Sequence, residues 1–148
     1  MGVSAILISE KSKEIINNQQ PMDKSIIERV RVNLAERGVI IEQSEMMDKF
    51  LIQRGAEAAT LAPGDLIILH TKVSASGFYE ELIHYGQFRR GNIDISSKSD
   101  IIKNEIEAQE RLIKYQKAYK ITDYEIEVLK NNLGIYKAKL EMIMNGGI

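Results

Sequence analysis

The sequence contains no cysteine, and this absence excludes three kinds of chemistry. Disulfide scaffolds, thiolate zinc sites and cysteine nucleophiles all need a thiol. Histidine is nearly as scarce, because His70 and His84 are the only two histidines in 148 residues. Sites built from several imidazoles are therefore excluded as well, and any metal site would need carboxylates to complete it.

The chain also lacks an excess of charge of either sign and a long apolar run. Lys and Arg number 20 and Asp and Glu number 21, for a formal net charge of -1. This balance disfavours non-specific nucleic-acid binding, although it leaves a local basic patch open. The most apolar internal stretch, residues 62–70, is interrupted by Pro63, Gly64 and Asp65 and is far shorter than the roughly 20 residues of a membrane span. We therefore expect no membrane span.

The apolar start of the chain does not have the pattern of a secretion signal. Residues 1–9 lack a basic lead-in and are followed at once by Glu10 and Lys11, so they predict a short strand or an ordered leader. We expect no signal peptide in this chain, so that secretion or delivery would depend on something else.

The remaining composition, 44% hydrophobic and 28% charged residues, is that of a globular protein. We expect a single domain over residues 1–148, with residues 1–23 a loose leader and residues 39–142 the core. The periodicity predicts helices at 24–37, 44–55, 78–90, 100–119 and 123–144, with one or two short strands at 39–41 and 66–69, the second buried on both faces. The expected fold is α+β and mainly helical, with short strands, an active-site helix and two longer C-terminal helices.

The helix predicted at 78–90 carries the residues with the most chemistry. Phe78 and Leu82 fall on an apolar arc, whereas Glu80, His84 and Gln87 fall on the opposite side and Glu81 lies beside His84. One interpretation is a solvated face with a Glu80–His84 pair at i, i+4. The other is that Glu80 and His84 point into a cleft and share a ligand or metal, with Glu81 acting beside them.

The spacing of these residues is related to a known zinc-binding pattern. In the helix signature His-Glu-x-x-His, two ligands four residues apart face one metal, and the glutamate between them activates the bound water. Here the five residues are Glu80-Glu81-Leu82-Ile83-His84, so the pattern matches at Glu81 and His84, and a carboxylate replaces the first imidazole. Carboxylates also bind zinc, as harder and more charged ligands.

Glu105, in the next predicted helix, lies within an otherwise apolar arc, together with Gln109 and Gln116. A carboxylate directed at a core is costly unless it is paired, protonated or bound to a cation. Glu105 is therefore either paired with an Arg or a Tyr in the core, or it completes the group of Glu80, Glu81 and His84. The second interpretation predicts that Glu105 and His84 meet, and a separation above roughly 8 Å would exclude a shared metal with bonds of about 2 Å.

Three further residues near this helix have simpler interpretations. His70 ends the predicted strand at 66–69 and is expected to cap or to pack, with reaching the site as the alternative. Arg89 and Arg90 follow the last turn of the helix, where the macrodipole favours positive charge without any phosphate.

The stretch Phe78–Gly91 (FYEELIHYGQFRRG), followed by Glu105–Ile113 (EIEAQERLI), resembles C-terminal toxin domains of bacterial polymorphic toxins, and in particular the zincin-type metallopeptidase toxins. The strand predicted at Leu66–Leu69 and the closing helix with Tyr124–Glu127 fit the same layout, a minimal zincin-like core. The resemblance covers roughly residues 45–140, and residues 1–40 add nothing to it.

The resemblance implies a role for each matching residue. Glu81 would be the general base, His84 a metal ligand, and Glu105, or less favourably Glu107, the later acidic ligand, with Glu80 in place of the first histidine. It further implies a zinc cofactor, delivery into a competing cell and a cognate immunity protein as partner.

Three functional hypotheses remain open at this point. The first is an antibacterial effector domain with hydrolytic, zincin-like peptidase activity. The second is a metal-independent nuclease toxin in which Glu81 and His84 perform acid/base work while Arg89 and Arg90 hold phosphate. The third is a binding module without chemistry.

Overall fold

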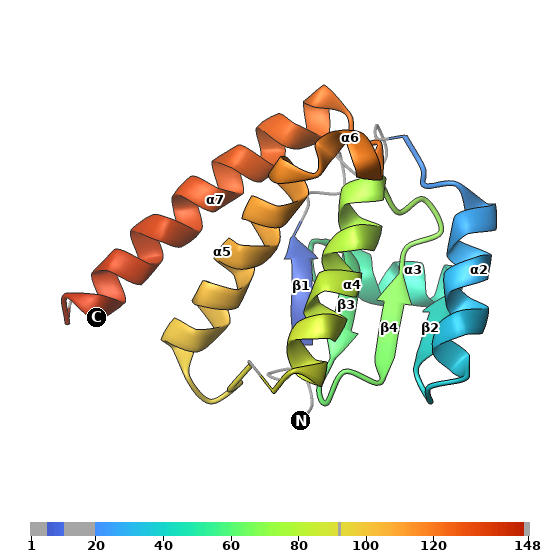
Figure 1. Ribbon diagram of the computed structural model, residues 1–148, viewed down its shortest axis with the longest axis horizontal. Coiled ribbons are helices and arrows are strands. Elements are labelled where there is room, and N and C mark those ends of the chain that lie inside the picture. Colours follow the sequence, from blue (N-terminus) through green and yellow to red (C-terminus); the bar gives the residue numbers. More distant parts are fainter. Residues whose placement is uncertain (1–5, 11–19, 92, 147–148) are drawn as a thin grey trace.

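A computed structural model describes residues 6–10, 20–91 and 93–146, and of residues 6–10 it describes only the backbone (Figure 1). A small sheet is flanked by helices, so the expected α+β and mainly helical fold is confirmed. The elements in chain order are β1 (Ile6–Glu10), α2 (Lys24–Ala35), β2 (Ile40–Gln43), α3 (Glu45–Ile52), β3 (Ala56–Leu61), β4 (Leu66–Leu69), α4 (Ala75–Arg89), α5 (Lys98–Lys114), α6 (Gln116–Tyr119) and α7 (Asp123–Met144).

The strands form one sheet in the order β1-β3-β4-β2. Strands β3 and β4 are antiparallel neighbours joined by the turn at 62–65, β1 pairs antiparallel with β3, and β2 pairs parallel with β4. Strand β4 therefore has a neighbour on each side. Its residues Ile67, Ile68 and Leu69 are buried, which confirms the expectation of burial on both faces.

Strand β3 was not predicted, so the expectation of one or two short strands is wrong. Its sequence, Ala56-Glu57-Ala58-Ala59-Thr60-Leu61, contains alanine and glutamate, which are depleted in strands. The strand forms because β1 and β4 supply hydrogen bonds on its two sides and because helices cover both of its faces. These are tertiary effects that local propensity does not contain.

The caps explain most of the helix boundaries. Helix α4 begins three residues earlier than predicted, because the Ser74 hydroxyl accepts a hydrogen bond from the Gly77 amide. The helix predicted at 100–119 is interrupted at Tyr115, which separates α5 from the short α6. Helix α7 begins at Asp123, as predicted, with a capping box in which Thr122 and Glu125 each bond the backbone amide of the other.

Parts of the expected leader belong to the fold. Residues 6–10 form the edge strand β1, and Met22 is buried in the core, its amide donating to the Val73 carbonyl. Residues 12–19 of the expected loose connection lie outside the described part of the chain.

The helices cover the sheet unequally (Figure 1). Helix α3 packs on one face, where Leu51 is clustered with Ile68 and with Ala56 and Ala59 of β3. Helices α2 and α4 cover the other face, and α5 packs against α4 with α7 alongside it. Within the described residues, no helix is long and apolar enough to cross a membrane. Helix α4 is thus enclosed between the sheet and α5, and this position determines the environment of its polar residues.

Candidate metal centre

The polar side of α4 is buried, and the interpretation of a solvated face is therefore wrong. Glu80, Glu81 and His84 retain only 3%, 0% and 0% of their exposure, whereas Leu82, on the expected core arc, is only partly buried. The physical reason is that β3 and α5 both pack against the side of α4 that carries these residues, where Thr60 of β3 bonds Glu81 and Glu105 of α5 reaches His84. A side packed against two other elements leaves no room for solvated charges.

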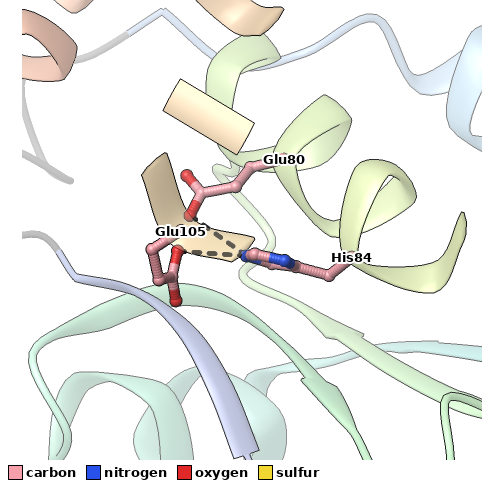
Figure 2. A group of neighbouring side chains, drawn as sticks. All are labelled: Glu80, His84 and Glu105. Atoms are coloured by element: carbon pink, nitrogen blue, oxygen red, sulfur yellow. Dashed lines mark ion pairs between the residues drawn. The ribbon is translucent and has the colours of Figure 1, made fainter. Parts of the chain in front are cut away.

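Three of the predicted residues come together at this interface. Glu80 and His84 lie one turn apart on α4, and Glu105 reaches them from α5 (Figure 2). The Nε2 atom of His84 lies 3.2 Å from Oε1 of Glu105 and 3.6 Å from Oε2 of Glu80. The prediction that Glu105 and His84 meet is confirmed. Glu105 is paired with His84 in this group.

Two separations in this group have the size found between ligands of one small cation. In a tetrahedral site with bonds of about 2.0–2.2 Å, neighbouring ligand atoms are about 3.3–3.6 Å apart. The two measured separations, 3.2 and 3.6 Å, have this size, and one ligand atom from each of the three residues lies within 4.8 Å of the others. A charge-assisted hydrogen bond would be shorter, about 2.7–2.9 Å. Glu80, His84 and Glu105 could therefore hold a metal ion.

The second nitrogen of His84 is held by Gln87. The Nδ1 atom of His84 lies 2.7 Å from Oε1 of Gln87, and Nε2 of Gln87 donates to the carbonyl of Asn104 and to Glu107. Glu107 is half-exposed and also forms an ion pair with Arg90, at 3.7 Å. The structure therefore places Gln87 beside the three ligands and Glu107 behind Gln87, so Glu107 is not one of the grouped ligands.

The electrostatics of the group favour positive charge on the ring. Complete burial is the largest single effect and lowers the pKa of His84, but it is outweighed by the negative charge of Glu105 together with the contacts to Glu105 and Glu80 and the charge of Glu81. The pKa of His84 is in consequence raised well above its ordinary value. The space between the ring and the two carboxylates attracts a cation, whether a proton or a metal ion.

Glu81 is directed toward the sheet and not into the group of ligands. The hydroxyl of Thr60, on β3, donates to Oε1 of Glu81 at 2.6 Å. The carboxylate nevertheless lies near enough to His84 for its charge to raise the pKa of the ring. Glu81 is thus positioned as a neighbour of the group, fixed by a strand that the sequence did not predict.

His70 and the two arginines lie outside the group. Nδ1 of His70 accepts from the amide of Lys72, and Nε2 lies 3.7 Å from Asp48 of α3, which fits the expected capping and packing role. Arg89 is exposed at the end of α4, and Arg90 is engaged by Glu107.

Two contributors to the site were missed, Thr60 and Asn104. Thr60 had no local signal because β3 itself was not predicted. Asn104 contributes its backbone carbonyl, which no side-chain pattern reveals. By contrast, the spacing of His84 and Gln87 at i, i+3 on one helix is a local signal for a contact.

Comparisons of the chain with protein-family models, with curated proteins and with solved structures found no match.

Proposed function

We propose that this protein is a metal-dependent hydrolase in which Glu80, His84 and Glu105 hold a zinc ion. One observation carries the proposal: three buried side chains from two helices bring their ligand atoms within 4.8 Å of one another. The Nε2 atom of His84 is buried among them and makes no hydrogen bond within the described chain. Burying a carboxylate without a cation beside it costs free energy, so a bound cation would stabilise this group.

The charges favour a divalent ion over a proton. Ionised Glu80 and Glu105 carry two negative charges in a site that is almost closed to water. A proton on His84 offsets one of these charges, whereas a divalent ion offsets both and leaves the imidazole neutral. In surroundings of low polarity an uncompensated charge costs several kcal/mol. The single imidazole and two carboxylates are ligands that zinc accepts.

The chain supplies a candidate base beside the ligands. A zinc ion held by Glu80, His84 and Glu105 would supply a coordinated water of lowered pKa as the nucleophile. Glu81 follows Glu80 directly, one of its oxygens is bonded by Thr60, and its charge acts on His84, which supports it as the nearby carboxylate that could accept a proton. We assign to it the role of general base in hydrolysis, with a peptide bond as the favoured substrate.

We extend the proposal to an antibacterial effector domain of a polymorphic toxin, delivered into a competing cell and neutralised by a cognate immunity protein. Its support is the resemblance carried by Phe78–Gly91 and Glu105–Ile113, and the buried site gives those residues a common chemistry.

Metal analysis of protein purified without chelator tests the zinc site. We expect about one equivalent of zinc in the wild type and none in His84→Gln or Glu105→Gln. Two matched variants are controls: His70→Gln removes the other histidine, and Glu110→Gln removes an exposed carboxylate of the same helix. Zinc retained by His84→Gln, or equally lost in the controls, would contradict the proposed ligands.

Expression in a bacterial host, with and without the neighbouring open reading frame, tests the effector function. We expect growth inhibition by the wild type alone and none by Glu81→Gln, which keeps the oxygen that accepts from Thr60 but cannot take up a proton. Equal growth with wild type and variant, both folded, would leave Glu81 without a catalytic role and would favour the binding module.

The raised pKa of His84 supports a second candidate, a metal-independent acid/base site in a nuclease toxin. In that case a proton on the ring replaces the metal, and Glu81 and His84 perform the chemistry. Intact zinc-free activity, together with degraded RNA or DNA in intoxicated cells, would favour this candidate over the metallopeptidase. The engagement of Arg90 by Glu107 leaves only Arg89 of the pair exposed and outside an ion pair in the described chain.

A further inference from the structure

The side chain of Gln87 is fully buried, and its amide has three partners. Its Nε2 atom donates to the carbonyl oxygen of Asn104 at 3.0 Å and to Oε1 of Glu107 at 2.6 Å. Its Oε1 atom lies 2.7 Å from Nδ1 of His84. Both ends of the amide are thus occupied.

These partners fix the orientation of the amide. A carbonyl oxygen and a carboxylate oxygen are acceptors only. If the amide were turned over, Oε1 of Gln87 would face these two acceptors, and both hydrogen bonds would be replaced by repulsion between oxygens. The oxygen of Gln87 therefore faces His84, and Nδ1 of His84 must carry the hydrogen of that contact.

We infer that Gln87 is a positioning residue, which holds His84 in the tautomer that turns an unprotonated Nε2 toward Glu80 and Glu105. This inference rests on the proposed function, because it names the residue that prepares the ring for the metal. A ring nitrogen that binds a metal needs its lone pair, and the donation of the other N–H to an acceptor fixes both the tautomer and the plane of the ring.

Glu107 and Arg90 extend this arrangement to the surface. Glu107 accepts from Gln87 and forms an ion pair with Arg90, and both of these charged side chains are half-exposed. A charged acceptor holds the Gln87 amide more firmly than a neutral one, since hydrogen bonds to ionised groups are about twice as strong. The contacts run from the buried ring of His84 through Gln87 to Glu107.

Two variants of Gln87 and one matched control test the inference. Gln87→Leu removes both ends of the amide, whereas Gln87→Glu keeps an oxygen for Nδ1 of His84 and replaces the donor to Asn104 and Glu107 by a second oxygen. The control is Gln116→Leu, because Nε2 of Gln116 also donates to a carbonyl oxygen, that of Ile121, and to a carboxylate, that of Asp123. The control loses the same kinds of hydrogen bond away from the three ligands.

Two quantities are measured in each folded protein. The first is zinc affinity, by competition with a chromophoric chelator. The second is the tautomer of His84, from ¹⁵N shifts of metal-free protein at a pH where the ring is neutral. With two histidines in the chain, His70→Gln assigns the signals.

We expect Gln87→Leu to lose about 10- to 100-fold in zinc affinity and to lose the preference for hydrogen on Nδ1. Gln87→Glu should keep that preference for hydrogen on Nδ1, and Gln116→Leu should match the wild type in both tautomer and zinc affinity. Unchanged affinity and tautomer in Gln87→Leu would overturn the role of Gln87 while leaving the metal site intact. Absence of zinc binding by the wild type would instead overturn the proposed function. The tautomer of His84 in Gln87→Leu would then alone decide whether Gln87 positions the ring.

Discussion

His84 occupies a position that few side chains tolerate. The ring is completely buried, with two carboxylates facing Nε2 and the Gln87 amide facing Nδ1. The pKa of such a residue differs between the folded and the unfolded state, so its contribution to the free energy of unfolding depends on pH. The metal-free protein makes this dependence measurable.

We expect metal-free protein to become less stable as the pH rises. In the unfolded chain the pKa of His84 is about 6.5, and in the folded chain it is raised, chiefly by Glu105, against the effect of burial. The folded state therefore binds the proton more tightly. This contribution is fully present below about pH 6.5 and is lost as the pH rises through the folded pKa.

Urea denaturation at a series of pH values, after chelation, measures this effect. Glu80, Glu81 and Glu105 are the charged groups that raise the pKa of the ring, and they remain in the control variant His84→Gln. The control should lack this decline. Identical pH profiles for the two proteins would contradict the raised pKa.

Single residues also show what could be read from the sequence. Glu105 was identified because a carboxylate within an apolar arc is a local anomaly with a physical cost. The burial of Glu80 and Glu81 was not identified, because the sequence does not show which elements pack against their side of α4. That information belongs to the packing of α5 against α4.

At the scale of elements, α4 approaches β3 closely at Gly77. A Cβ atom placed on Gly77 would lie 2.5 Å from Cδ of Glu57, a buried carboxylate of β3. Glu57 also accepts hydrogen bonds from the amide and the hydroxyl of Ser74, which caps α4. The absence of a side chain at Gly77 is therefore what lets the start of α4 lie against the sheet.

We expect Gly77→Ala and Gly134→Ala to have opposite effects on stability. Alanine is favoured over glycine in a helix by about 1 kcal/mol, and at Gly134 of α7 nothing lies within 4 Å of the added atom. At Gly77 the displacement of Glu57 costs about 1–3 kcal/mol, as overpacking of a core does, so that the gain is outweighed. Chemical denaturation of both variants measures the two changes, and stabilisation by Gly77→Ala would contradict the close approach.

Elements with local signals were predicted well, and those without were not. The caps at Ser44 and Thr122 lie within the chain segments that they cap, and both helices begin where expected. Strand β3 lacks such a signal, because its alanines favour helices and are depleted in strands. Its identity follows from the neighbours that pair with it.

For the whole molecule, the last helix contributes a substantial part of the core. Ile126 and Leu129 of α7 are buried, and Glu125 accepts from the amide of Ser76 at the start of α4. Three further apolar residues of α7 are partly buried, namely Leu133, Tyr136 and Leu140. Helix α7 therefore packs on α5 and also supports the start of the helix that carries the site.

Truncation after Thr122 is expected to abolish cooperative folding. Fully burying Ile126 and Leu129 contributes about 1.5–3 kcal/mol each, and the partly buried residues and the exposed surface of α5 add to the loss. A typical domain has only about 5–15 kcal/mol to lose. A fragment 1–122 with a sharp thermal transition, measured by circular dichroism, would contradict this expectation.

Removal of zinc should lower the melting temperature of the full chain. At free zinc 100-fold above the dissociation constant, binding to the folded state alone stabilises it by about 2.7 kcal/mol. For a chain of this length, each kcal/mol corresponds to about 2–4 °C. We expect chelation to lower the melting temperature of the wild type by roughly 5–11 °C and to leave that of His84→Gln unchanged. An unchanged melting temperature in the wild type would contradict a zinc site.

The pairing of β1 with β3 has a consequence for the order of folding. Ile6 of β1 pairs with Leu61 of β3, and the segment between them is most of the first half of the chain. The segment between Glu80 and Glu105 is much shorter. The entropy lost on closing a loop grows with its length, and distant strand pairs form slowly. We therefore expect the α4–α5 pair to assemble, with its three ligands, before β1 completes the sheet. Zinc present during refolding would then accelerate the early phase and leave the docking of the edge strand as the slow step.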